Sequence, residues 1–586
     1  MASDAPNPSL VSLVTSRFTT NALSAIPRSL HLRTMDSELA ALELAIRQAR
    51  QMRNSRAGAC NLPREVIAHI FECLQRLWPP RRVYVKAKPR FYAGWMSVSH
   101  VCSVWREVAL DVPSLWTRPK LDVFSIPHQY ITDILIRSRS GTLDLSVIWG
   151  GGSEDIEGDP GVKAWLSPAI SRRTSGLTIV AEDDMEASLL AFELPKQWQR
   201  LHTLNMTQRE PDTILELPPS LQMLRGITCL SLEGYHIPWN TPILSSALSE
   251  LHLGYDDLVH RPPYDKLRAT LASLELLEVL ELRNIAPRFG RTGSQLPLIM
   301  PASLQRLKTS CMTNPALGMD ALTFVSLIHT CPRCNRYHAL PGFSNHTPNI
   351  TLINDTLSQL LPVLALSTND DLQIRHLHLI CDAMRLVSDA IPPLSSDQLS
   401  RPSKELVSNT LFATDFTKNE PPMHFHLADY LPHVPLERLR TISLDTSSVR
   451  FIERKHLWPR LLRADSVCAL GLLKTHTPYN DFAYMLDALR VPQAGSKGDE
   501  ARMLFPRLEV LAVPFTKDEG AHSKMIIALI DLLHVRQESR MPLLELLVPK
   551  EAGHWTMWHS LRAMLKITAI DYPTIESPVV PYDSWT

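Results

Sequence analysis

The chain has 586 residues, and 60 Lys and Arg residues balance 60 Asp and Glu residues, so its formal net charge is zero. This length exceeds one ordinary domain, and balanced charge provides no long-range attraction for nucleic acid or an anionic membrane. Apolar runs fall short of the roughly 20 residues of a membrane span, so no membrane association is expected. Nine scattered cysteines favour a reducing compartment, cytoplasm or nucleus, over a disulfide framework.

The N-terminal stretch divides into two segments. Residues 1–35 are rich in Ser and Thr, which is typical of a disordered tail. Residues 36–56 predict an amphipathic helix, with Asp36 as its cap, because apolar residues recur at spacings of three and four. These residues are Leu39, Leu42, Ile46 and Ala49. Two heptads are marginal for a dimerising coiled coil, so packing on the next element is the favoured interpretation.

Two stronger helices follow. The segment LPREVIAHIFECL, residues 62–74, predicts a helix with Pro63 in its first turn. Its broad apolar face consists of Val66, Ile67, Ile70, Phe71 and Leu74. A second helix is expected from about Ser97 until Pro113 closes it. Its stripe consists of Val98, Val101, Cys102, Trp105, Val108 and Ala109.

Residues 77–94, between these helices, read as an inserted basic loop. Its positive charges, with Arg76 beside them, are Arg81, Arg82, Lys86, Lys88 and Arg90, and its aromatic residues are Trp78, Tyr84 and Phe91. Basic residues beside aromatic ones can hold single-stranded nucleic acid. They can equally solubilise a loop or contact an acidic partner protein. Nucleic acid is the less favoured interpretation.

From residue 118 to 570 the sequence pattern changes, and short segments in which apolar and polar residues alternate predict strands. GTLDLSVIW, residues 141–149, alternates as a half-buried strand does. A hexad of the form apolar-x-x-apolar-x-apolar then recurs, for example in ITCLSL, LSELHL and LEVLEL. Its first six copies start 21 to 29 residues apart, at 174, 201, 227, 248, 277 and 304. This period indicates an irregular leucine-rich-repeat-like α/β solenoid, followed by a C-terminal tail at 571–586.

The segment CPRCNRYH is the best metal candidate, since Cys331, Cys334 and His338 have ligand-like spacing. A structural zinc needs a fourth ligand, and only Cys311 or His346 lies near in sequence. The favoured interpretation is a repeat helix that runs into the next strand, with the hexad CNRYHA facing the core through Cys334. We therefore expect no metal ligand, no cofactor and no catalytic residue, because no common catalytic motif is present either.

The two N-terminal helices, taken together, resemble an F-box. The pattern Leu-Pro-x-Glu begins at Leu62, and Val-Cys-x-x-Trp-Arg-x-Val-Ala begins at Val101, with Pro-x-Leu-Trp after it. Residues 60–117 are thus identified as an F-box-like domain, and the degenerate repeats behind it are similar to those of fungal F-box proteins. The inserted loop departs from the compact family pattern.

The resemblance implies a small all-α docking domain before a repeat domain that binds a target protein. Such a chain is a non-catalytic substrate-recognition subunit of a Skp-cullin-F-box ubiquitin ligase. It docks on the Skp adaptor and, through it, on a cullin, while the target stays unidentified. The alternative is an F-box-bearing scaffold without ubiquitin transfer. The residues expected to contact the adaptor are Leu62, Pro63, Ile67, Ile70, Phe71, Val101, Cys102 and Trp105. We expect two or three of them to pack only against the domain's own helices, and Trp105 is the strongest case.

Overall fold

The computed structural model describes most of the chain in two compact units. The first unit is Met1–Thr178 with Glu193–Arg200, and the second is Ile179–Phe192 with Leu201–Thr586. The boundary expected at residue 118 therefore lies inside the first unit. The described residues are 8–19, 24, 26–85, 88–117, 121–148, 160–181, 194, 198–209, 214–254, 260–290, 295–310, 318–331, 334–341, 374–380, 383–388, 413–415, 431–472, 482–494, 501–570 and 572.

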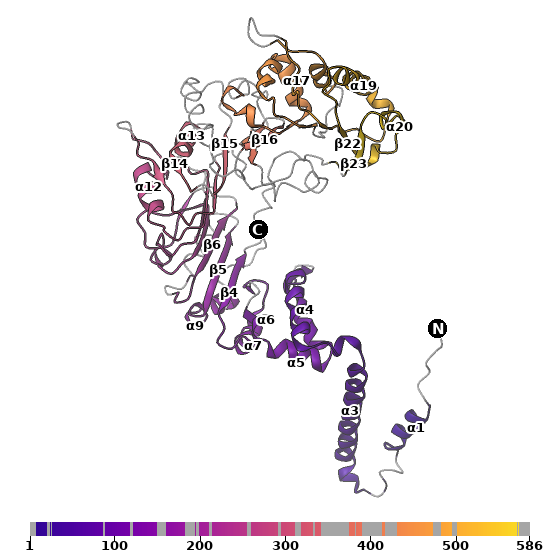
Figure 1. The fold of residues 1–586 in the computed structure, drawn as a ribbon. Helices are drawn as coiled ribbons and strands as arrows, with labels where there is room; N and C mark the ends of the chain where they lie inside the picture. The colour runs from indigo at the N-terminus through magenta and orange to yellow at the C-terminus, as the bar shows by residue number, and fades with distance from the viewer. Residues whose placement is uncertain are drawn as a thin grey trace. The chain divides into compact units, whose positions relative to one another are not determined.

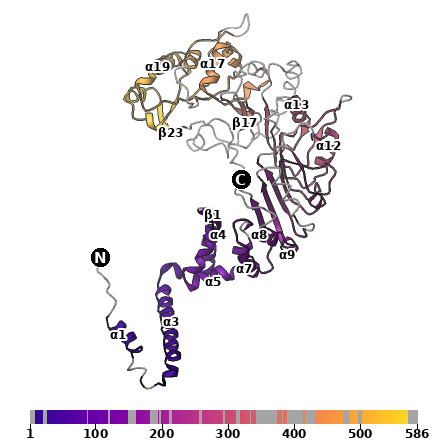
Figure 2. The same ribbon diagram turned by 180° about the vertical axis from the view of Figure 1, so that it is seen from behind.

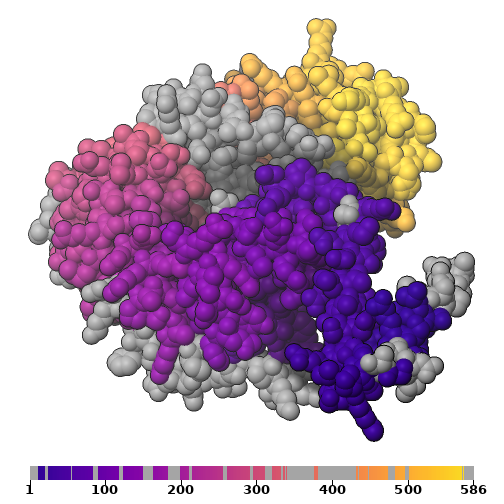
Figure 3. All heavy atoms as spheres, turned by 90° about the horizontal axis from the view of Figure 1, so that it is seen from below, coloured from indigo at the N-terminus to yellow at the C-terminus, as the bar shows by residue number. Residues whose placement is uncertain are grey.

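Among the described residues, the α-helices before Leu62 are α1 (Pro8–Ser16) and α3 (His31–Ser55) (Figure 1). The stretch 1–35 therefore contains helix where a disordered tail was expected. Because α3 begins at His31, Asp36 lies within the helix and does not cap it. Its apolar stripe is not buried by the next element, since Leu39 and Ile46 are each 50% exposed. The indigo atoms of these helices are open to view in Figure 3.

The segment expected as one helix from Ser97 is two elements. A 3-10 helix, η3, covers Gly94–His100, and α5 covers Ser103–Asp111. Cys102 between them has extended backbone angles, φ −157° and ψ 173°, and its thiol accepts a hydrogen bond from the Trp105 amide at 3.4 Å. The capping thiol therefore starts a new helix where the periodicity alone predicted continuity.

The inserted basic loop is also more ordered than expected. It forms an antiparallel hairpin of β1 (Arg81–Val85) and β2 (Lys88–Tyr92), which follows α4 (Arg64–Leu77) (Figure 2). The Val, Tyr and Phe residues of these segments favour strand pairing, and this preference outweighs the density of charge.

The rest of the first unit is mixed. The strand expected at 141–149 is confirmed, because β4 buries Leu143, Leu145 and Val147 almost completely. A short strand, β3, pairs with it in parallel, and a later strand, β5, spans the boundary between the units. The elements are α6 (Ser114–Thr117), β3 (Leu121–Asp122), η4 (His128–Tyr130), α7 (Ile131–Arg137), β4 (Leu143–Ile148), α8 (Pro160–Trp165), α9 (Pro168–Ser171) and β5 (Thr174–Ala181).

Parallel strands in chain order form the second unit's part of a ten-stranded sheet, which also includes β3, β4 and β5, and each strand given next pairs with the one before it in that series. They are β6 (Thr203–Gln208), β8 (Cys229–Glu233), β10 (Glu250–Gly254), β11 (Val279–Arg283), β13 (Arg306–Ser310), β15 (Asn335–Pro341) and β18 (Ala413–Asp415). Minor strands are β7 (Leu215–Glu216), β9 (Tyr235–His236), β12 (Leu298–Ile299) and β14 (Ile328–His329), and the helices are α11 (Pro219–Gln222), α12 (Tyr264–Ala272) and α13 (Gly318–Leu327).

The hexads stack as their pattern predicts. Leu230, Leu251, Leu280 and Leu307 lie opposite one another on successive strands, and each is at most 1% exposed. The first apolar positions of these four hexads, at the bend before each strand, are equally buried; they are Ile227, Leu248, Leu277 and Leu304. Each copy therefore buries its apolar face against the next, which is how a repeat domain builds its core.

The hexad CNRYHA is out of phase with this ladder. Leu307 pairs with Arg336, and Thr309 pairs with His338. The residues of β15 that continue the leucine ladder are therefore Arg336 and His338, and not the apolar positions of the hexad, Tyr337 and Ala339. His338 is 2% exposed. A shift of one residue moves every side chain of a strand to the opposite face, so the apolar pattern predicted the wrong face of β15 as the buried one.

A second sheet holds the C-terminal repeats, with β16 joined to an antiparallel partner and to a run of parallel strands in chain order. The strands are β16 (Ile374–Ile380), β17 (Ala383–Ser388), β19 (Thr441–Leu444), β20 (Ala469–Leu472), β21 (Val510–Ala512), β22 (Glu545–Pro549) and β23 (Lys566–Ile570). The helices are α17 (Thr446–Arg454), α18 (Phe482–Arg490), α19 (Ser523–Glu538) and α20 (Trp558–Leu561). The tail 571–586 lies outside the described residues except Tyr572.

The fold is thus a helical N-terminal region followed by an α/β region whose parallel sheets resemble a repeat fold. In the part of the chain that the structure describes, no helix combines the length and the apolarity needed to cross a membrane.

Candidate docking site

Helix α4 supplies the floor of the candidate docking site. Pro63 stands at its N-cap and Glu65 lies in its first turn, where a carboxylate favours the helix dipole. Ile67 and Phe71 are at most 1% exposed and form the side that faces the rest of the domain. Gln75 continues this side, and its side-chain amide donates to the Leu115 carbonyl at 2.5 Å. One side of α4 is therefore committed to the domain's own core.

Helix α5 packs on that side through Trp105. The Trp105 ring meets the Phe71 ring edge to face, with centroids 5.3 Å apart. Its indole N–H donates to the Ala59 carbonyl at 3.3 Å, so the turn that follows α3 is also tied to the domain. A second aromatic pair, Trp95 and Trp116, lies 5.0 Å apart, and both rings are buried. Aromatic contacts thus hold α4, η3, α5 and α6 together.

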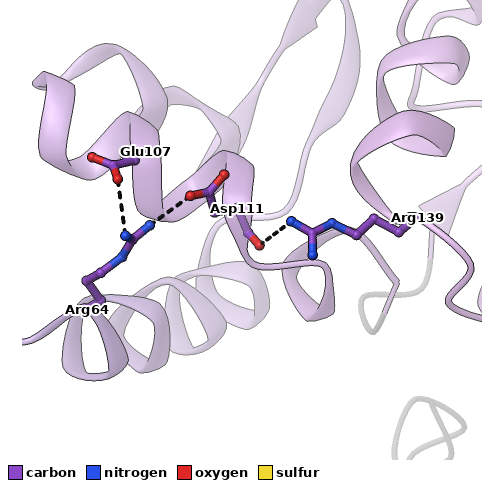
Figure 4. A network of polar contacts seen from close by, with 4 residues as sticks. All are labelled: Arg64, Glu107, Asp111 and Arg139. Carbon is purple, nitrogen blue, oxygen red and sulfur yellow. Dashed lines mark hydrogen bonds and ion pairs between the residues drawn. The ribbon is translucent and has the colours of Figure 1, made fainter.

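A polar network joins the outer ends of the helices (Figure 4). The Arg64 guanidinium donates to Glu107 at 3.1 Å and to Asp111 at 2.8 Å, and Arg139 donates to the Asp111 carbonyl oxygen at 3.4 Å. These carboxylates and Arg64 are all more than half exposed, so water screens the attraction. The network orients the start of α4 against α5 and adds little stability.

The eight predicted contact residues divide by exposure. Leu62, Pro63 and Val101 are exposed, with 38% of Leu62 and 59% of Val101 accessible. Ile70 and Trp105 are partly buried. Ile67, Phe71 and Cys102 are buried within the domain. Their apolar character is explained by packing inside the domain.

The sequence prediction overlooked a second apolar line on α4. Val66 is 43% exposed and Leu77 is 81% exposed, and the thiol-bearing Cys73 between them is exposed as well. At 100° per residue these positions and Ile70 share one side of the helix, next to the buried side. The signal was present in the spacing, because Leu62, Val66 and Ile70 recur every four residues, but the broad face hid it.

The metal candidate is not assembled. Among the described residues no three His, Cys, Asp or Glu side chains are grouped to hold a metal ion. Cys331 contacts the Leu304 carbonyl, whereas the His338 ring bonds the Thr309 hydroxyl at 2.8 Å. Burial raises the pKa of the Cys334 thiol to about 11, which disfavours a thiolate. The fourth-ligand candidates Cys311 and His346 lie outside the described residues.

The comparison with protein families agrees with this geometry. The model of the F-box-like family matches residues 59–122. No curated protein matches the chain. A similar solved structure is the crystal structure of the leucine-rich repeat-containing protein LegL7 from Legionella pneumophila, which is 12% identical, with a TM-score of 0.27 over 62% of this chain and 92% of that chain. Residues 59–122 therefore form an F-box-like domain.

Proposed function

We propose that this chain is the substrate receptor of a Skp-cullin-F-box ubiquitin ligase, of the fungal type. The observation that carries the proposal is the apolar line of α4, inside a domain that matches the F-box-like family. Val66 and Leu77 of this line are exposed, Ile70 is half-buried, and the exposed Leu62 continues the line just before the helix. A line of this kind, left uncovered in the domain that bears it, is suited to a partner protein.

The docking surface in this proposal consists of the exposed and half-buried candidates. These are Leu62, Pro63, Val66, Ile70, Val101 and Trp105. Burying one aliphatic side chain is worth roughly 1.5 to 3 kcal/mol, so this set offers several such contributions before association costs are subtracted. Ile67, Phe71 and Cys102 support the surface from behind by fixing α4 against α5.

The repeats are proposed as the target-binding part. Between the buried leucines of the ladder, the alternate positions Ser231, His252, Glu281 and Lys308 lie opposite one another. Glu281 accepts from Lys308 at 3.0 Å and lies 3.3 Å from the His252 ring. Burial acts to raise the pKa of Glu281, but these two partners outweigh it and the pKa is lowered. A charged, polar sheet face of this kind suits recognition of a protein segment.

In this role the chain performs no chemistry and works in the cytoplasm or nucleus. The second candidate is a scaffold that docks an adaptor without ubiquitin transfer, and it uses the same surface. Whether a cullin joins the complex separates the two.

The direct test is co-purification of the full chain with a Skp adaptor. Val66→Glu places a charge on the exposed line, and Leu62→Ala with Pro63→Ala removes its N-terminal end. Both variants are expected to lose the adaptor, whereas Ile136→Glu, at a residue 68% exposed on α7, is the matched control and keeps it. Unchanged binding of the Val66 variant contradicts the surface, and absence of binding by the wild type contradicts the function. A cullin missing from an otherwise intact complex favours the scaffold.

A further inference from the structure

The hairpin β1–β2 carries an unusual concentration of positive charge. From Cys73 to Arg106 the chain has seven Lys and Arg residues and no Asp or Glu. The rest of the chain compensates for this, because the formal net charge is zero. The charge is therefore local to this segment, and it acts over roughly one Debye length of 10 Å rather than as a field of the whole protein.

The base of the hairpin is held rigidly. The Trp95 amide donates to the Trp78 carbonyl at 2.8 Å, which closes the stem. Gly94 lies there with φ +53°, and a side chain at this position would meet the Trp78 carbonyl oxygen at 2.5 Å. Trp95 is itself buried against Trp116. The hairpin thus projects from a fixed base in the F-box-like domain.

The register sorts the hairpin side chains onto two faces. Arg82 lies opposite Phe91, and the Phe91 ring packs on Tyr130 of η4 with centroids 4.9 Å apart. Arg81 lies opposite Tyr92, and Arg90 is two residues before Tyr92 on the same strand, so these three share the other face. Arg81 and Arg90 are exposed, and 40% of Tyr92 is accessible. One face therefore packs on the domain and the other presents two arginines.

Both guanidinium groups gather around one ring. The Arg81 and Arg90 guanidinium carbons lie 6.0 and 5.8 Å from the Tyr92 ring centroid. Each has a favourable cation–π contact, but the arrangement also brings two positive charges close together. No ion pair within the described residues neutralises Arg81 or Arg90. A bound carboxylate would relieve the repulsion and accept hydrogen bonds from both groups.

We propose that this face of the hairpin binds an acidic segment of a partner protein. Carboxylates of the segment pair with Arg81 and Arg90, and Tyr92 keeps the two guanidinium groups in position. Single-stranded nucleic acid is disfavoured on this face of the hairpin because its bases need a free aromatic ring to stack on, whereas the Tyr92 ring is occupied by the two arginines. The proposal is independent of adaptor docking, which uses the apolar line of α4.

The test is fluorescence anisotropy with the full chain and two labelled probes, a short poly-glutamate peptide and oligothymidylate. The peptide is expected to bind, and binding should weaken as salt rises because exposed ion pairs are screened. Arg81→Gln with Arg90→Gln should weaken it about tenfold, the loss of two exposed charge pairs. Tyr92→Leu keeps both positive charges but removes the ring that holds the two guanidinium groups in position, so we expect a smaller loss of peptide affinity.

The matched control is Arg47→Gln with Arg50→Gln, which removes the same charge from the exposed surface of α3 and should leave peptide binding unchanged. Absence of peptide binding by the wild type overturns the proposal, as does an equal loss in the control. Tighter binding of oligothymidylate than of the peptide overturns it in favour of nucleic acid. Co-purification with the adaptor is measured in parallel and should survive the hairpin substitutions, so failure of one proposal does not imply failure of the other.

Discussion

The thiol sulfurs of Cys60 and Cys102 lie 3.6 Å apart, although 42 residues separate them in the chain. Cys60 is in η2 (Gly58–Cys60), just after α3, and Cys102 caps α5. Their hydrogen bond, with burial as a smaller cause, raises the pKa of Cys60. The contact ties the N-terminal edge of the F-box-like domain to the junction that carries Val101.

We predict that a thiol oxidant such as diamide links Cys60 to Cys102. Sulfur atoms in contact need only a small movement to bond, and closing a 42-residue loop is worth at most about 4 kcal/mol in the chain-entropy account. The melting temperature should therefore rise on oxidation, and peptide mapping should show the linked pair. Cys60→Ser should abolish both effects and Cys73→Ser, at an exposed thiol, should preserve them. A link through Cys73 instead would contradict the prediction.

Gly94→Ala should destabilise the first unit. The substituted residue would keep φ near +53° and bring its Cβ within 2.5 Å of the Trp78 carbonyl oxygen and 2.6 Å of the Pro79 backbone. Backbone atoms cannot move aside cheaply, so we expect a loss of about 3 kcal/mol in unfolding free energy. Gly58→Ala is the control, because nothing lies within 4 Å of its Cβ position. Equal stability of the two variants in denaturant titrations would show that the hairpin base is not rigid.

Much of the fold could be predicted from apolar spacing. The hexads indicated strands with stacked leucines, and Leu251 and Leu280 lie opposite each other as expected. The prediction of the buried face was wrong for the CNRYHA copy, because its core-facing positions are Arg336 and His338, and an apolar pattern does not identify such residues. Their polar atoms are accommodated by tertiary contacts such as the bond between His338 and Thr309.

The helices of the candidate site could be predicted from the sequence, but which of their apolar side chains are exposed could not. Helical spacing located α4 and α5, yet it could not show which apolar residues each helix buries against the other. Phe71 is buried because Trp105 packs on it, and Val66 is exposed because α5 does not reach that side. Such pairings join residues distant in sequence, and only the fold reveals them.

Leu280→Ala should be costly because Leu280 lies in the middle of the leucine ladder. It is 1% exposed between Leu251 and Leu307, and removing most of its side chain leaves a cavity among neighbours that cannot collapse freely. We expect a loss of about 3 kcal/mol, measured by chemical unfolding. Leu276→Ala in the preceding turn is the control, since Leu276 is 60% exposed and should change stability little. Similar losses for both would contradict the stacked-repeat core.

His338 should make the stability of the second unit depend on pH. Burial, with a smaller contribution from the Arg336 charge, lowers the pKa of His338 from 6.5 to about 3. Between these values the unfolded chain binds a proton that the folded chain does not, so unfolding becomes easier as pH falls. The stabilising contribution is complete above pH about 6.5 and declines by up to about 1.4 kcal/mol per pH unit below it.

The measurement is the unfolding free energy of the full chain at several pH values, compared between variants because other groups titrate in the same range. His338→Asn retains a polar partner for Thr309 but cannot be protonated, so its stability should fall less steeply between pH 6.5 and the acid limit of folding. His559→Asn, at an exposed position, should keep the wild-type slope. If the His338 variant also keeps that slope, the ring takes up its proton in the folded chain at an ordinary pH, and burial in the sheet does not hold it neutral.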